Sequence, residues 1–138
     1  MPLKTVLFCS QKDALARPAW PGWTVISVTN AIASPVELKD GWEHVLRLAF
    51  DDVDTPMEPY IMFSEPQARN IIEFAAMCHS EGIEGILIHC YAGISRSSAI
   101  AKWIADRYQL PFDDKYFEYN QHVYMTLREE QMLIGFEG

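Results

Sequence analysis

Cys90 lies in a segment whose residue types favour nucleophilic chemistry on an anion. An apolar run that ends at Ile88 precedes His89 and Cys90, and Arg96 follows six residues after the cysteine, where a helix is predicted to begin. A loop at a helix N-terminus offers unpaired N–H groups and a partial positive charge, which suit a phosphate. The same field lowers the pKa of a thiol from about 8.5 to roughly 3.5–7.5, and a guanidinium binds an anion through two parallel hydrogen bonds. The segment therefore predicts covalent phosphoryl chemistry.

The segment from His89 to Ser97 resembles the signature of the cysteine-dependent protein tyrosine phosphatases, in which His-Cys is followed by five residues and then Arg-Ser. Its portion from Ala92 to Ser97 is most similar to the compact dual-specificity branch. The resemblance covers residues 45–108, and the flanks agree only in length and element order. It implies that residues 1–138 form a single dual-specificity phosphatase-like domain, with an α/β fold of the protein tyrosine phosphatase type.

The residues of this loop have distinct expected roles. Cys90 is expected to attack phosphorus and form a cysteinyl-phosphate intermediate, which divides one difficult hydrolysis into two easier steps; a buried structural cysteine is the alternative. Arg96 is expected to bind phosphate oxygens more tightly in the transition state, the alternative being a surface salt bridge. Gly93 permits a positive φ and a close approach of the backbone, although a plain turn glycine fits as well. Phosphate-binding N–H groups are expected from Tyr91, Ala92, Gly93, Ile94 and Ser95.

Three further residues receive roles from the resemblance. His89 would orient the loop and tune the cysteine, and the Ser97 hydroxyl would stabilise the departing thiolate; a satisfied buried histidine and a helix cap are the alternatives. A general acid must protonate the leaving oxygen, and in the family it is an Asp on a mobile loop that follows a strand. The register of residues 46–52 favours Asp52 over Asp54 and Asp51, while an acidic turn that only solvates the loop is the other interpretation.

The elements that must position these residues are expected to alternate between strand and helix. Apolar and β-branched runs predict strands at residues 5–8, 24–28, 44–50 and 86–88, the last buried under helices on both faces. Ser64 and Gln67 have the spacing of a capping box, and Gly82 ends that helix. A second helix carries residues 99–108. A last helix is expected to start near Asp113 and to direct six side chains toward the core: Tyr116, Phe117, Asn120, Val123, Tyr124 and Leu127.

Such an order implies a mainly parallel central sheet flanked by helices, with right-handed crossovers. Ligands bind outside the carboxyl ends of strands in these sheets. The Cys90 loop follows one strand, and the acidic segment after Phe50 follows another. Both loops are therefore expected at the same edge of the sheet.

Composition narrows the functional classes. A net charge of −8 with no basic stripe disfavours nucleic acid as a partner. No apolar run is long enough for a membrane span, and the first residues lack the pattern of a secretory signal. Three unevenly spaced cysteines argue against a disulfide framework, which fits a cytoplasmic protein. Cys78-His79 and His89-Cys90 lack the ligand spacing of a zinc site, so neither a metal nor another cofactor is expected.

The predicted function is a metal-independent phosphomonoester hydrolase that acts on a phosphorylated protein or peptide, with a small phosphomonoester less favoured. A phosphate- or phosphopeptide-binding module without turnover is one alternative. A rhodanese-like sulfurtransferase is another, but its usual loop has Arg five positions after the cysteine, where this chain has Ser95. Val6 to Ser10 is similar to the opening of the low-molecular-weight phosphatases, yet the next arginine comes too late. Cys78 is a candidate disulfide partner of Cys90 under oxidation.

Overall fold

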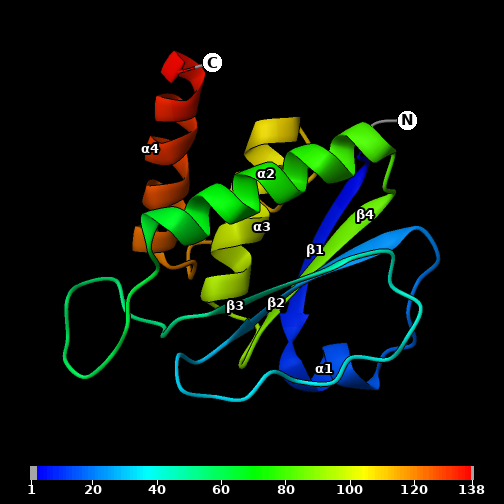
Figure 1. Ribbon diagram of the computed structural model, residues 1–138, viewed down its shortest axis with the longest axis horizontal. Helices are drawn as coiled ribbons and strands as arrows, with labels where there is room; N and C mark the ends of the chain where they lie inside the picture. The colour runs from blue at the N-terminus through cyan, green and yellow to red at the C-terminus, as the bar shows by residue number, and fades with distance from the viewer. Residues whose placement is uncertain (1–2, 138) are drawn as a thin grey trace.

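The strands of the protein form one parallel sheet, seen in a computed structural model that describes residues 3–137 (Figure 1). Within this part of the chain the strand order is β1-β4-β2-β3, and every neighbouring pair is parallel. The elements, in chain order, are β1 (Thr5–Ser10), α1 (Gln11–Ala16), β2 (Trp23–Thr29), β3 (Val45–Ala49), α2 (Glu65–Glu81), β4 (Gly85–Cys90), α3 (Arg96–Tyr108) and α4 (Gln121–Glu137). The predicted α/β domain with a parallel central sheet flanked by helices is confirmed.

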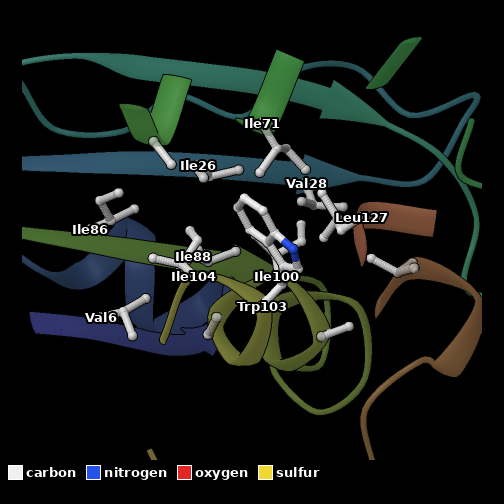
Figure 2. Close-up of a cluster of buried hydrophobic side chains, with 14 of the residues drawn as sticks. Val6, Ile26, Val28, Ile71, Ile86, Ile88, Ile100, Trp103, Ile104 and Leu127 are labelled. Atoms are coloured by element: carbon white, nitrogen blue, oxygen red, sulfur yellow. The ribbon is translucent and has the colours of Figure 1, made fainter. Parts of the chain in front are cut away.

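One face of the sheet packs against the long helices α2, α3 and α4 (Figure 1). Successive side chains of a strand point to opposite faces, so Ile26 and Val28 of β2 and Ile86 and Ile88 of β4 share this core with Ile100 of α3 (Figure 2). All of them are fully buried. Burial of such a side chain contributes about 1.5–3 kcal/mol each, which makes β4 and α3 a rigid support for the loop between them.

The opposite face of the sheet is covered differently from the prediction. Trp20, Trp23 and Trp42 form a cluster of edge-to-face ring contacts, with centroids 4.7 and 6.1 Å from the Trp20 ring. The Trp23 ring lies so close over Gly85 that a Cβ there would be 2.4 Å from it. The short helix α1, which was not predicted, lies at the carboxyl ends of β1 and β4 (Figure 1). Aromatic packing therefore takes the place of a long helix on this face.

The start of α2 has the predicted capping box. Ser64 Oγ accepts a hydrogen bond from Gln67 N at 3.3 Å, and Ser64 N donates to Gln67 Oε1 at 3.0 Å. The Gln67 amide also donates from Nε2 to the carbonyl of Ala49 at 2.9 Å, which joins the helix to the end of β3. The helix ends at Gly82, whose φ of 74° is in the left-handed region. This part of the prediction is confirmed.

The prediction for the last helix is wrong at its start. Residues 113–120 form a turn and a loop, because Asp113 Oδ1 accepts from Lys115 N at 3.0 Å and its carbonyl accepts from Tyr116 N at 3.0 Å. Phe117, expected in the core, is 80% exposed. Helix α4 instead begins at Gln121, and Asn120 Oδ1 caps it by accepting from Val123 N at 3.0 Å.

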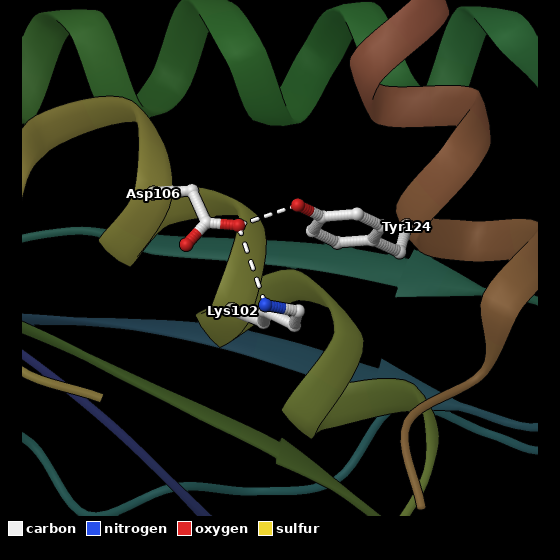
Figure 3. A network of polar contacts seen from close by, with 3 residues as sticks. All are labelled: Lys102, Asp106 and Tyr124. Atoms are coloured by element: carbon white, nitrogen blue, oxygen red, sulfur yellow. Dashed lines mark hydrogen bonds and ion pairs between the residues drawn. The ribbon is translucent and has the colours of Figure 1, made fainter. Parts of the chain in front are cut away.

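A polar network joins α4 to α3 close to this loop. Asp106 Oδ2 accepts hydrogen bonds from the Tyr124 hydroxyl and, at 3.5 Å, from Lys102 Nζ (Figure 3). The Lys102 ammonium also lies 5.6 Å from the Tyr119 ring centroid and 5.1 Å from that of Tyr124. These contacts fix the first turn of α4, and with it the loop that precedes it, against α3. In residues 3–137, no helix combines the length and apolar character that crossing a membrane requires.

Candidate active site

The loop between β4 and α3, residues 91–95, is forced into its path by one glycine. Gly93 has a φ of 73°, and a Cβ at that position would lie 2.4 Å from Ser10 N and 2.5 Å from the carbonyl carbon of Cys9. Both neighbours are backbone atoms at the end of β1, so they cannot rotate away as a side chain could. Gly93 is therefore required both by its positive φ and by the close approach of the loop to β1.

The carbonyl groups of this loop are bonded from outside it. The acceptor carbonyls belong to Tyr91, Ile94 and Ser95, and their donors are Gln11 N at 3.2 Å, the Tyr116 hydroxyl and Asn120 N at 3.0 Å. In a planar trans peptide the carbonyl and the following N–H point to opposite sides. The N–H groups that follow these carbonyls therefore face away from the outer partners, which is the arrangement an anion-binding loop needs.

Cys90 has the electrostatic surroundings of a thiolate. Its side chain is 2% exposed, and its Sγ lies 3.2 Å from Ser97 Oγ. Burial pushes the pKa of the thiol upward, but the Ser97 hydroxyl, the backbone N–H groups of Ser97 and Gly93, and the charge of Arg96 together outweigh it. The pKa of Cys90 is consequently lowered from its ordinary value. The alternative of an inert structural cysteine does not account for this set of donors.

Arg96 is anchored beneath the site rather than on the surface. Only 4% of it is exposed, and Nη1 donates to the carbonyl of Phe50 at 2.8 Å. That carbonyl follows directly after β3, so the sheet edge holds the guanidinium in place. Among residues 3–137, the buried Nε of Arg96 has no hydrogen-bond partner. A buried donor without a partner is costly, and an anion in front of the loop would satisfy it. A surface salt bridge, the alternative interpretation, is excluded by this burial.

His89 supports the loop from the other side of the sheet. Its side chain is fully buried, and Nε2 lies 2.6 Å from Ser27 Oγ on β2. Burial lowers the pKa of His89 to about 4, so the ring is neutral at pH 7. The contact between His89 Nε2 and Ser27 Oγ joins the end of β4 to β2, which suits the expected orienting role.

The three candidate general acids have different environments. The Asp51 carboxylate accepts hydrogen bonds from Ala31 N at 3.1 Å and from Ile61 N at 2.8 Å, so it holds its own loop together. Asp52 is exposed, and its Oδ1 accepts from Ser95 Oγ in the Cys90 loop at 2.8 Å. Asp54 is exposed and lines, with Asp52, an open hollow of about 480 Å³. Of the three, Asp52 contacts the loop that carries the cysteine.

Ser97 is not the cap of α3. The helix begins at Arg96, its N-cap is Ser95, and Ser97 lies inside the first turn with its side chain fully buried. The capping interpretation of Ser97 is therefore wrong, and its hydroxyl is free to face Cys90.

Sequence reasoning missed two residues that hold the site together, Tyr116 and Asn120. Both were assigned to the core side of a helix, whereas Tyr116 bonds the Ile94 carbonyl and Asn120 bonds the Ser95 carbonyl. The signal for Asn120 was present, since Asn is a preferred N-cap residue. The predicted helix begins too early, so Asn120 falls inside it and not at its cap.

The other two cysteines lie in unfavourable positions for a thiolate. Burial raises the pKa of Cys9 to about 11 and that of Cys78 to about 11. Cys78 faces Thr24, which is in register with Ile86 at the amino end of β4, about 13 Å along the strand from Cys90 at roughly 3.3 Å per residue. A disulfide between Cys78 and Cys90 would need Cα atoms within about 7 Å, so the fold separates this pair. Within the described residues, no three His, Cys, Asp or Glu side chains are grouped so as to hold a metal ion.

Comparison with known proteins identifies the fold. No family model matches the chain, and no curated protein matches its sequence. In three dimensions it is similar to the crystal structure of the human tyrosine phosphatase-like serine/threonine/tyrosine-interacting protein, with a TM-score of 0.54 and 18% sequence identity over 80% of this chain and 77% of that one. The chain therefore has a tyrosine phosphatase-like fold, in agreement with the expectation from the sequence.

Proposed function

We propose that the protein is a metal-independent phosphomonoester hydrolase of the protein tyrosine and dual-specificity phosphatase type. The observation that carries the proposal is the convergence on Cys90 Sγ of the Ser97 hydroxyl, the N–H groups of Gly93 and Ser97, and the Arg96 charge. These groups stabilise a thiolate, and the same N–H groups and guanidinium suit the oxygens of a phosphate bound in front of it. The tyrosine phosphatase-like fold supports the same assignment.

In the first step the Cys90 thiolate attacks phosphorus, and the bond from phosphorus to the leaving oxygen breaks. A cysteinyl phosphate forms, and Asp52 gives its proton to the departing alcohol or phenol. Arg96 and the loop N–H groups bind the three non-bridging oxygens, and they bind most tightly as charge is redistributed in the transition state.

In the second step water attacks the cysteinyl phosphate and the bond between sulfur and phosphorus breaks. The Asp52 carboxylate takes the proton from the water, which returns the acid to its starting form. The Ser97 hydroxyl, 3.2 Å from Cys90 Sγ, stabilises the thiolate as it departs. The products are inorganic phosphate and the dephosphorylated alcohol or phenol, so the sum is a simple hydrolysis.

A phosphorylated protein or peptide is the proposed substrate class. The exposed side chains around the loop include Tyr91 and Ile94, while Asp54 and Glu118 line the neighbouring hollow. Neutral and acidic surroundings disfavour substrates with several phosphates, because Arg96 is the cation that this loop itself supplies.

A binding module without turnover is the second candidate, and the name of the similar human protein gives it support, since that protein is called phosphatase-like and interacting. Both candidates predict phosphate binding in front of Cys90. They differ in whether bound phosphate monoester is hydrolysed.

Hydrolysis of a phosphopeptide panel in the presence of EDTA separates these candidates. The wild type is expected to release phosphate, and Cys90→Ser is expected to lose turnover by on the order of 10⁶-fold, the loss typical of removing a nucleophile, while it retains phosphopeptide binding. Cys9→Ser is the matched control, because its thiol lies at the end of the neighbouring strand with its pKa raised to about 11. Turnover by Cys90→Ser equal to that of the wild type would refute the proposal. Binding without any hydrolysis by the wild type would favour the binding module.

A further inference from the structure

Asp52 is held by two side chains from distant parts of the sequence, and both bond the same oxygen. Asp52 Oδ1 accepts from Ser95 Oγ at 2.8 Å and from Asn120 Nδ2 at 2.9 Å. Ser95 belongs to the Cys90 loop, and Asn120 is the residue before α4. Within residues 3–137, no protein donor bonds Asp52 Oδ2.

We propose that Ser95 and Asn120 are positioning residues that grip Asp52 by Oδ1 and thereby direct Oδ2, which carries the transferred proton, toward the leaving group. The inference rests on the proposed phosphatase function and deepens it, since it assigns roles to two side chains that do not touch the reacting atoms.

The amide of Asn120 has its orientation fixed by contacts on both sides. Its Oδ1 accepts from Val123 N at 3.0 Å, so the nitrogen must face the acidic loop, where it donates to Asp52 and also to the Val53 carbonyl at 3.2 Å. Only 5% of Asn120 is exposed. A rotated amide would place its nitrogen against an N–H donor, which makes this orientation the stable one.

Three hydrogen bonds close a ring between the Cys90 loop, the acidic loop and α4. Asn120 N donates to the Ser95 carbonyl at 3.0 Å, Ser95 Oγ donates to Asp52, and Asn120 Nδ2 donates to Asp52. The ring therefore sets the distance between the general acid and the loop that would hold the phosphate. Proton transfer requires heavy atoms about 2.6–3.2 Å apart, and a misplacement of about 1 Å costs on the order of 10²-fold in rate.

Both donors are neutral, which matters for an acid that must be protonated before it can act. A positively charged partner would hold the carboxyl group in its ionised form. A hydroxyl and an amide can bond Oδ1 whether Oδ2 carries a proton or not. The grip therefore fixes geometry through both steps of the proposed reaction, in which Asp52 first gives and then takes a proton.

Leaving-group dependence provides the test, because a good leaving group needs no proton from the acid. The rates to compare are kcat/KM for p-nitrophenyl phosphate, with an activated phenol, and for phenyl phosphate, with a poor one. Asn120→Ser keeps an N-cap residue for α4 but is too short to reach Asp52, and Ser95→Ala removes the other donor. Each is expected to lower kcat/KM for phenyl phosphate by about 10-fold to 10²-fold and for p-nitrophenyl phosphate by less than about threefold.

Three controls separate positioning from general damage. Asn70→Ser makes the same chemical change at an exposed position of α2 and is expected to leave both rates unchanged. Ser95→Thr keeps the hydroxyl and is expected to retain the phenyl phosphate rate. In an Asp52→Asn background, Asn120→Ser is expected to have no further effect on either substrate, since there is no acid left to position.

The positioning role would be overturned if Asn120→Ser and Ser95→Ala lowered kcat/KM equally for the two substrates, or for neither. It would also be overturned if Asn120→Ser caused its full loss of kcat/KM in the Asp52→Asn background. A different result identifies failure of the proposed function: a wild type no faster than Cys90→Ser on both substrates would overturn the phosphatase assignment and this inference with it.

Discussion

Two cysteines lie at the carboxyl ends of neighbouring parallel strands, and the pKa values of their thiols are shifted in opposite directions. Cys9 is near the end of β1 and Cys90 is at the end of β4, with Cys9 in register with His89. A helix follows each strand. Yet the pKa of Cys90 is lowered, whereas that of Cys9 is raised to about 11.

The difference lies in what separates each strand from its helix. Helix α1 starts directly after Ser10, whose Oγ accepts from Asp13 N at 3.2 Å and is thus used as a cap. No loop of N–H groups surrounds Cys9, and burial of its thiol outweighs the charge of Arg17. After Cys90, five residues of loop intervene, and the Ser97 hydroxyl, the N–H groups of Ser97 and Gly93, and the charge of Arg96 together outweigh the burial of the thiol. A cysteine at a strand end before a helix therefore does not have a lowered pKa for that reason alone. This is why residues 6–10 do not form a second site.

Arg96→Lys is expected to cause the largest loss of function at the Cys90 site. The lysine keeps the positive charge but loses the planar fork and the bond from Nη1 to the Phe50 carbonyl. We expect kcat for phosphopeptide hydrolysis to fall by about 10²–10³-fold, the loss typical of removing one transition-state donor. Arg107→Lys, on the exposed face of the same helix, is the matched control and should retain wild-type kcat. A lysine variant with full kcat would show that charge alone, without geometry, makes Cys90 differ from Cys9.

The second prediction concerns Gly93, where the Cys90 loop packs against the end of β1. Gly93→Ala would pay the cost of a positive φ and also force its Cβ against the backbone of Cys9 and Ser10. We expect the free energy of unfolding to fall by about 3 kcal/mol, measured by urea denaturation. Gly22→Ala has a similar φ of 82° but only an ordinary 4.0 Å contact, so it should lose about 1–2 kcal/mol. Equal losses in the two variants would mean that the loop can move away from β1 without cost.

Local patterns were sufficient to predict much of the fold. Residues close together in the sequence determine the strands, the capping box of Ser64 and Gln67, and the end of that helix at Gly82. The segment from Cys90 to Arg96 is equally local, because its strand, loop and helix follow one another directly. These features could be predicted because neighbouring residues determine them.

The contacts that complete the site are not local. Arg96 is anchored by the Phe50 carbonyl. Asp52 is held by Ser95 and Asn120. The partners are far apart in the sequence, so a local sequence pattern cannot predict these contacts. The register of the sequence favours Asp52, but its contact with Ser95, which sets it apart from Asp51 and Asp54, is visible only in the tertiary structure. The start of α4 was misplaced because Tyr116 and Phe117 fit a helical spacing, while the turn at Asp113 and the cap at Asn120 determine the real boundary.

The smallest expected effect is that of Ser97→Ala, which would make Cys90 more like Cys9. Burial has the largest effect on the pKa of the Cys90 thiol and raises it. The hydrogen bond with the Ser97 hydroxyl has the next largest effect and lowers this pKa, which favours the thiolate. Without it the pKa of Cys90 should rise, so the thiolate fraction at pH 7 should fall and full reactivity should be reached only at higher pH. A hydrogen bond to a charged group contributes about 1.5 kcal/mol, which is roughly tenfold in the ionisation equilibrium. We therefore expect the pH profile for alkylation of Cys90 by iodoacetamide to move to higher pH.

The measurement is the pH dependence of alkylation at each cysteine, followed by mass spectrometry of the separate peptides. Cys9 provides the internal reference, since with a pKa of about 11 its reactivity should rise through the whole accessible alkaline range in both proteins. Ser80→Ala is the matched control, because it removes a hydroxyl at an exposed position of α2, away from the Cys90 loop. If Ser97→Ala and Ser80→Ala left the Cys90 profile equally unchanged, the loop N–H groups and Arg96 would suffice to separate the two thiols, and Ser97 would have no part in the difference.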